Sequence, residues 1–198
     1  MTTGFSRPSL APGYSLIECV IGLAFVASAS AVVAPMAASV VDAARARQAA
    51  GFMAAQFRLA RQQAARTGAA EALVFDDSAG AWTFRVCRDG NGNGVRRSEL
   101  GGIDPCQGGL VRLSTLFPAV TIACDPSVPD PGGVAGSTDP VRFGASNIAS
   151  FSPLGSGTAG TLYLMSAEGA RYAVRVAGVT GRTRVLRFER STGRWVES

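Results

Sequence analysis

The sequence predicts an α+β fold in which a long, hydrophobic N-terminal helix packs on an antiparallel β-sheet or β-sandwich domain. Three observations carry this prediction. Residues 14–41 contain a single charged side chain, Glu18. A helical spacing of apolar residues then continues to Thr67. After Gly68 the pattern changes to short runs with a period of two, separated by turn-forming residues.

The composition excludes several classes of protein. A chain of 198 residues with 47% hydrophobic and 17% charged residues is neither disordered nor larger than one ordinary domain with an added segment. The net charge is +5, all of its positive side chains are arginine, and it has no histidine. Because Ser-His-Asp and Cys-His catalysis both need histidine, we expect that this protein is not an enzyme.

Residues 14–41 are long enough to cross a membrane. As a helix rising ~1.5 Å per residue they would span roughly 42 Å, more than the ~30 Å hydrocarbon core. The alternative is a secretory signal peptide with the mature chain beginning near Ala34, but the apolar stretch exceeds the hydrophobic region of such peptides. We therefore expect a transmembrane helix. A carboxylate such as Glu18 is costly in hydrocarbon unless a positive partner neutralises it.

A second, amphipathic stretch extends the helix beyond Val41. Six residues at spacings of three and four share one face, and we expect them in the core: Ala46, Ala49, Met53, Phe57, Ala60 and Ala64. Gly68 is a typical helix stop. Residues 14–67 are thus predicted to form one transmembrane and stem helix.

The remaining residues, 68–198, are predicted to form a β-rich globular domain. Short connections between runs favour antiparallel hairpins. The loop 125–140 is rich in proline and glycine. The expected strands are 71–75, 82–87, 110–113, 120–123, 141–143, 148–151, 161–165, 172–176, 184–188 and 194–196.

The residues from Gly13 to Glu18, GYSLIE, resemble the cleavage and methylation motif of type IV prepilins and pseudopilins. The resemblance implies that a prepilin peptidase removes the leader 1–13 by cutting after Gly13, and that Tyr14 is then N-methylated. It also implies that Glu18 pairs with the N-terminal amine of a neighbouring subunit during assembly. Pro35 matches a proline that many pilins carry and should kink the helix, because it removes a backbone hydrogen bond.

Other segments are similar to the GspH/FimT family of minor pseudopilins. They are FRLARQQA at 57–64, FSPLG at 151–155, GTLYL at 160–164 and TGRTRV at 180–185. The resemblance implies a type IV pilin-like fold, with a β-sandwich-like domain on the N-terminal helix. It further implies a minor subunit of a type II secretion pseudopilus or a type IV pilus, with a role in protein secretion or pilus biogenesis. Such a protein is a single-pass inner-membrane protein with a periplasmic C-terminal domain. Its partners are other pilins or pseudopilins, prepilin peptidase and the inner-membrane assembly platform.

Charge is unevenly distributed: residues 69–168 carry a net −4, whereas residues 169–198 carry a net +5. Within the basic end, Arg182 and Arg184 lie in a sequence similar to the GRxR motif associated with DNA capture in FimT-type minor pilins. The resemblance makes a DNA-binding minor pilin the alternative function, since arginine matches phosphate geometry. The other interpretations are a solvated sheet face or a contact with the acidic region of a neighbouring subunit.

The segment DGNGNG at 89–94 matches the first half of a calcium-binding loop, with Asp89, Asn91 and Asn93 as candidate ligands. The position expected for a bidentate glutamate holds Leu100, and Glu99 lies one residue short. A metal-free turn and a calcium site therefore both remain open. No other cofactor is expected.

The cysteines predict at most one disulfide in the β domain. Cys19 lies in the apolar stretch, which leaves Cys87, Cys106 and Cys124 as candidates. We favour a pairing of Cys87 with Cys106, which would close the base of the 89–99 loop. A pairing of Cys106 with Cys124 is the alternative.

Overall fold

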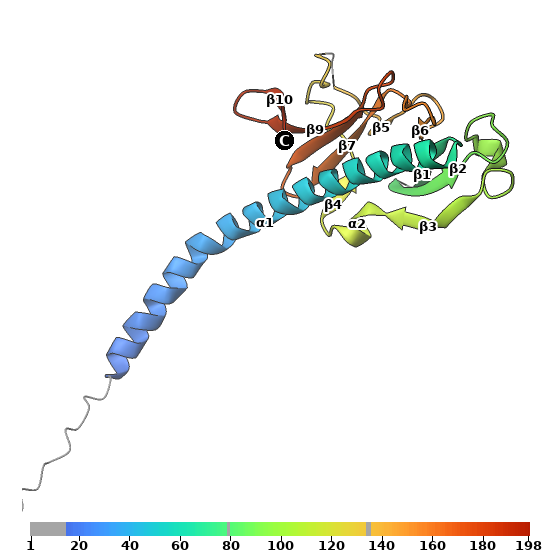
Figure 1. Ribbon diagram of the computed structural model, residues 1–198. Helices are drawn as coiled ribbons and strands as arrows, with labels where there is room; N and C mark the ends of the chain where they lie inside the picture. The colour runs from blue at the N-terminus through green and yellow to red at the C-terminus, as the bar shows by residue number, and fades with distance from the viewer. Residues whose placement is uncertain (1–14, 79, 134–135) are drawn as a thin grey trace, which may run out of the picture. The chain divides into compact units, whose positions relative to one another are not determined.

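The computed structural model describes residues 15–78, 80–133 and 136–198, apart from the side chains of residues 32–37. The chain divides into two compact units, Met1–Val40 and Val41–Ser198, and the boundary falls inside helix α1 (Leu16–Thr67). The sequence instead placed the domain boundary at residue 68. The boundary differs because side chains of helical residues after Val41 belong to the hydrophobic core of the second unit. Figure 1 shows this part of α1 lying along the strands. The predicted leader, with Gly13 and Tyr14, lies outside the described residues.

The predicted fold class, a pilin-like long hydrophobic helix on a β domain, is wrong in its first half. Helix α1 has 52 residues. Within the described ranges, however, no helix combines the length and apolar character needed to cross a membrane. The predictions of a transmembrane helix and of a single-pass inner-membrane location are contradicted by this finding.

Local hydrogen bonds explain where α1 begins and ends. The Ser15 amide donates to Glu18 Oε2 at 2.9 Å, and the Ile17 amide donates to Ser15 Oγ at 3.3 Å. This reciprocal arrangement is a capping box, which satisfies amides that have no partner inside the helix. At the other end, Gly68 adopts φ +70° and its amide donates to the Ala64 carbonyl at 3.0 Å. A left-handed glycine of this kind ends a helix.

The described residues after α1 form two antiparallel sheets with ten strands, which overlap the ten predicted runs. The first sheet has the order β3-β2-β1-β6, and the second has β10-β9-β8-β7-β4, with β5 also paired to β7. The strands are β1 (Glu71–Ser78), β2 (Ala81–Arg88), β3 (Cys106–Arg112), β4 (Val120–Ile122), β5 (Val141–Arg142), β6 (Ile148–Phe151), β7 (Gly160–Ser166), β8 (Arg171–Val176), β9 (Thr183–Glu189) and β10 (Arg194–Glu197). A short 3₁₀ helix, η1 (Arg97–Glu99), precedes β3, and a one-turn helix, α2 (Leu113–Leu116), follows it.

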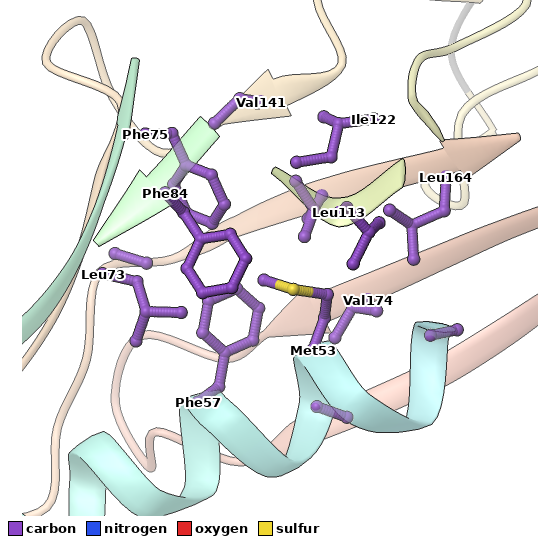
Figure 2. Close-up of a cluster of buried hydrophobic side chains, with 14 of the residues drawn as sticks. Met53, Phe57, Leu73, Phe75, Phe84, Leu113, Ile122, Val141, Leu164 and Val174 are labelled. Carbon is purple, nitrogen blue, oxygen red and sulfur yellow. The ribbon is translucent and has the colours of Figure 1, made fainter. Parts of the chain in front are cut away.

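The core of the second unit lies where the helical residues after Val41 meet both sheets. The six side chains predicted for the buried helix face are all at most 2% exposed, so that prediction is confirmed. Figure 2 shows Met53 and Phe57 pointing from the helix into a cluster with side chains of both sheets. The ring of Phe57 lies 5.5 Å from that of Phe143 and 6.3 Å from that of Phe75. These contacts fix the helical segment on the β domain.

A buried polar contact joins the start of this helical segment to strand β7. The Ser166 hydroxyl donates to Asp42 Oδ2, and the Ala170 amide donates to Ser166 Oγ at 2.9 Å. Asp42 is 5% exposed and Ser166 is 4% exposed. Hydrogen bonding offsets the cost of removing this carboxylate from water.

Candidate functional site

The strand register of the second sheet aligns three arginines in one row. Arg142 of β5 pairs with Thr161 of β7, Thr161 pairs with Arg175 of β8, and Arg175 pairs with Arg184 of β9. Directly paired residues project from the same face of a sheet. Neighbouring strands lie about 4.8 Å apart, so the row crosses roughly 14 Å of sheet.

This row lines a groove of about 760 Å³. A fourth arginine, Arg182, lines the groove from the turn between β8 and β9. Asp130 is the acidic residue among the described lining residues. Its Oδ2 forms an ion pair with Nη1 of Arg142. Within the described ranges, the guanidinium groups of Arg175, Arg182 and Arg184 have no hydrogen-bond or ion-pair partner.

Glycines fix the backbone on both sides of the groove. Gly181 adopts φ +59°, and a Cβ there would lie 2.6 Å from the Gly155 carbonyl oxygen. A Cβ on Gly160 would lie 2.2 Å from the Arg142 carbonyl oxygen. Side chains are therefore excluded at both positions. The turn that presents Arg182 is closed by the Gly181 amide, which donates to the Ala177 carbonyl at 2.8 Å.

The groove has the chemistry of a binding site for anions. Like charges placed directly opposite each other destabilise a sheet, and Arg175 opposite Arg184 is such a pair. A phosphate between the two guanidinium groups would remove this repulsion and accept hydrogen bonds from both. Several arginines in a row suit a ligand that carries several negative charges.

The sequence singled out Arg182 and Arg184, and the structure places both on this groove. Reasoning from sequence missed Arg142, Arg175 and Asp130. Arg175 had a weak signal, because the short connection between β8 and β9 limits which residues of the two strands can pair. Arg142 had none, since strand β5 has two residues and joins the sheet after a long loop.

The predicted calcium ligands lie in a loop whose polar groups are satisfied by the protein itself. Asp89 Oδ1 accepts from the amides of Asn91 and Gly92, and its Oδ2 accepts from that of Gly94 at 2.8 Å. The side-chain amides of Asn91 and Asn93 both donate to Glu99. Within the described part of the chain, no cluster of three or more histidine, cysteine or acidic side chains is arranged to hold a metal ion.

The electrostatics of Asp89 follow from the same contacts. Burial is the largest single influence and disfavours the charged carboxylate. The backbone amides of Gly94, Asn91, Gly92 and Asn93 together outweigh it, so the pKa of Asp89 lies below its ordinary value. The carboxylate therefore acts as the centre of the turn, and Glu99 holds the two asparagines.

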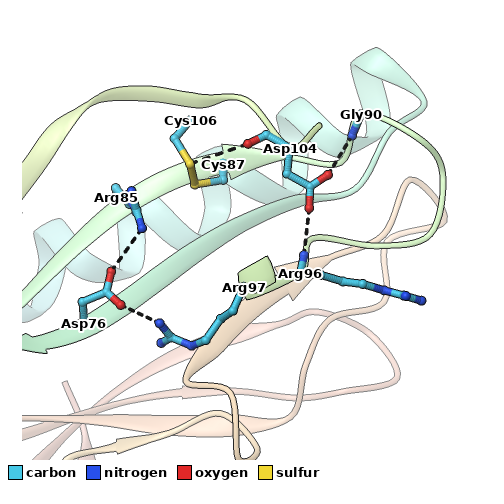
Figure 3. The surroundings of a disulfide bond; sticks show 8 residues. All are labelled: Asp76, Arg85, Cys87, Gly90, Arg96, Arg97, Asp104 and Cys106. Carbon is cyan, nitrogen blue, oxygen red and sulfur yellow. Dashed lines mark hydrogen bonds and ion pairs between the residues drawn. A yellow bond between two sulfur atoms is a disulfide. The ribbon is translucent and has the colours of Figure 1, made fainter. Parts of the chain in front are cut away.

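A disulfide joins Cys87 of β2 to Cys106 of β3, the pairing favoured from the sequence. Figure 3 shows Asp104 beside it, with its carboxylate accepting from the amides of Gly90 and Arg96 at 3.1 and 2.8 Å. The Asp76 carboxylate forms ion pairs with both Arg85 and Arg97, as Figure 3 also shows. The loop between the two cysteines is thus held covalently at its base and by carboxylates within it.

The other two cysteines differ in environment. Cys19 is exposed on α1. Cys124 is partly buried, and its thiol donates to the Ser137 carbonyl at 3.0 Å. Burial, followed by the charges of Asp139 and Asp125, raises the pKa of the Cys124 thiol. Burial and the raised pKa both lower the reactivity of the Cys124 thiol, since thiolate is the nucleophilic form.

The residues predicted for assembly are only partly described. Glu18 is exposed and accepts the Ser15 amide within its own helix. Pro35 falls within the bounds of α1, but its side chain lies outside the described part. Comparisons with models of protein families, with curated proteins and with solved structures find no match to this chain.

Proposed function

We propose that this protein is a minor subunit of a pilin-type filament, either a type IV pilus or the pseudopilus of a type II secretion system. The observation that carries the proposal is the set of large apolar side chains on α1 that the chain itself leaves uncovered. Their exposed fractions range from 56% at Val20 to 83% at Leu16. The set consists of Leu16, Ile17, Val20, Ile21, Leu23, Phe25 and Val26.

Helix-to-helix packing in a filament supplies the cover that these side chains lack. Burying one such side chain contributes about 1.5–3 kcal/mol. A helix with apolar side chains on all its faces is normally buried, and an exposed apolar patch of this kind marks an interaction surface. We take the partner surfaces to be the corresponding helices of other pilin-type subunits.

The resemblance of residues 13–18 to a prepilin motif supports the same proposal. Cleavage after Gly13 would give Tyr14 a free amine. A carboxylate has room for further donors besides the Ser15 amide, so Glu18 can cap its own helix and also accept the amine of a neighbour. The capping role predicts that Glu18→Gln keeps the helix start and loses only the charge-assisted contact.

The N-terminus of the mature chain tests the proposal most directly. Mass spectrometry of the protein purified from its producing cells should show loss of residues 1–13 and one added methyl group on Tyr14. A chain that keeps its leader, or that begins at another residue, would refute the proposed processing.

Thiol labelling tests the assembly step. The exposed Cys19 lies among the apolar side chains, so maleimide should label it quickly in the unassembled chain and slowly in filaments. The variants Glu18→Ala and Phe25→Ala should lower incorporation, whereas Arg66→Ala, at an exposed position of α1 in the other unit, should not. Equal labelling of Cys19 in both states would contradict packing through this helix.

A second candidate function is DNA binding, and the arginine groove favours it. Three of its four guanidinium groups have no partner within the described residues, and the row matches the repeated charge of a nucleic-acid backbone. In this proposal Arg175, Arg182 and Arg184 contact phosphates.

Fluorescence anisotropy with a labelled DNA oligonucleotide tests it. The double variant Arg182→Ala/Arg184→Ala should lose most affinity at low salt, and Arg66→Ala/Arg112→Ala is the matched control because it removes the same charge outside the groove. Equal affinity of the two double variants would refute the groove as the binding site.

A further inference from the structure

Asp130 is the acidic side chain of the arginine groove and is paired with one end of the arginine row. Its Oδ2 contacts Nη1 of Arg142, and its Oδ1 is buried without a hydrogen-bond partner in the described structure. The Asp130 side chain is 14% exposed, against 44% for Arg142. A carboxylate with one unsatisfied oxygen thus borders a groove that otherwise favours anions.

Contacts outside the groove hold Asp130 in this place. Trp195 Nε1 donates to the Pro129 carbonyl at 2.6 Å, directly before Asp130 in the chain. The Gly133 amide donates to the Asp130 carbonyl at 2.8 Å, which closes a turn behind it. Arg171 pairs with Asp125 at 2.5 Å, earlier in the same loop. The carboxylate is therefore positioned by the backbone around it as well as by Arg142.

We infer that Asp130 sets the selectivity of this groove by competing with the ligand for Arg142; the inference depends on the DNA-binding proposal. A single phosphate between Arg175 and Arg184 lies at the far side of Thr161 from Arg142 and does not meet the carboxylate. A chain of phosphates that follows the row reaches Arg142. There the ion pair with Asp130 keeps Arg142 from the phosphate, and the charge of Asp130 repels the phosphate.

Asp130→Asn should therefore strengthen binding of a phosphate chain and leave binding of a single phosphate unchanged. The affinity for a phosphate chain should rise about fivefold at low salt, which corresponds to the loss of one partly exposed ion pair. Because Arg142 then contacts a phosphate, the plot of log affinity against log salt should steepen by about 0.7 for a single strand. Removing charge at a distance does not change this slope.

The experiment uses the full chain and two probes, a labelled single-stranded DNA oligonucleotide and inorganic phosphate as competitor. Glu168→Gln is the control, because it removes one exposed negative charge at the turn between β7 and β8, at the opposite end of β7 from Thr161. The expected result is tighter oligonucleotide binding and a steeper slope for Asp130→Asn alone. Identical behaviour of the two variants overturns the inference and leaves the groove as a binding site.

Arg142→Gln completes a double-mutant cycle. In the wild-type background it should change oligonucleotide affinity little, and in the Asp130→Asn background it should remove the gain. An equal loss in both backgrounds overturns the inference, because it would show that Asp130 does not restrain Arg142. If neither the wild type nor any variant binds the oligonucleotide at low salt, the DNA-binding proposal itself is refuted. Thermal unfolding of each variant identifies a folding defect, and Asp130→Ser then replaces Asp130→Asn.

Discussion

Two stretches of helix α1 share a high content of apolar residues and differ in what those residues do. Residues 16–26 carry large side chains that remain more than half exposed, such as Leu16 and Phe25. Residues 46–64 carry mainly alanine on the buried face, with Met53 and Phe57 as the large members, and all are at most 2% exposed. Small side chains let the helix backbone approach the sheets closely. The apolar content of a helical stretch therefore indicates that its side chains favour burial. Whether they are buried depends on whether another part of the structure packs against them.

The largest difference should come from a phenylalanine in each stretch. Phe57→Ala should lower the free energy of unfolding of the β-domain unit by about 3–5 kcal/mol, because the ring contacts three other phenylalanines in the core. Phe25→Ala should change it by less than about 0.5 kcal/mol in the unassembled chain. Denaturant unfolding of both variants measures the two values. A similar loss for both would show that the stretches are equivalent.

Enlarging an alanine in each stretch sharpens the comparison. Ala49→Leu should lower the free energy of unfolding by about 1–3 kcal/mol, because position 49 is fully buried and the extra atoms must displace their neighbours. Ala27→Leu adds the same atoms at an exposed helical position and should leave the unfolding midpoint of the β-domain unit unchanged. If Ala49→Leu unfolds at the same midpoint as the wild type, the helix is not closely packed on the sheets.

A smaller effect is expected at the start of the exposed stretch. Glu18→Ala removes half of the capping box and should cost about 1 kcal/mol of local helix stability. Amide hydrogen exchange in the first turn should then be about fivefold faster. Glu18→Gln keeps an acceptor for the Ser15 amide and should restore most of the protection. The exchange of β-domain amides should be the same in all three proteins.

The smallest effect is a pH dependence confined to the β-domain unit. Hydrogen bonds from the Ser127 side chain and amide, followed by Arg171, lower the pKa of Asp125 from 3.8 to about 2. A lowered pKa in the folded state stabilises the fold above pH ~4, and this contribution is lost as the pH falls toward 2. Asp125→Asn should therefore melt slightly lower than the wild type at pH 7. If the difference persists near pH 2, the charge of Asp125 is not its source.

The sequence predicted those parts of the fold that depend on local pattern. The buried face from Ala46 to Ala64 followed from helical spacing, and each strand followed from alternation and turn residues. The sequence analysis did not predict the capping box, although Ser15 and Glu18 have the spacing of such a motif. The membrane-spanning prediction, which rested on the low charge of residues 14–41, is contradicted within the described residues.

The arginine groove could be predicted only in part. Arg182 and Arg184 lie in one short motif, so a sequence pattern can contain both. Arg142 joins them through strand β5, which is 42 residues earlier in the chain than Arg184 and pairs with β7 for only two residues. The pairing of Asp130 with Arg142 depends on the path of a proline-rich loop, and no period or spacing in the sequence encodes that path.

The contact between Asp42 and Ser166 bears on how the protein responds to mechanical tension. Asp42 is the second residue of the β-domain unit, so a pull on the preceding helix acts first on its bond to Ser166. Ser166 ends strand β7, which is hydrogen-bonded to β4 and β5 on one edge and to β8 on the other. The load therefore spreads into the interior of a sheet, where many backbone bonds share it, before any alanine of the helix leaves its place.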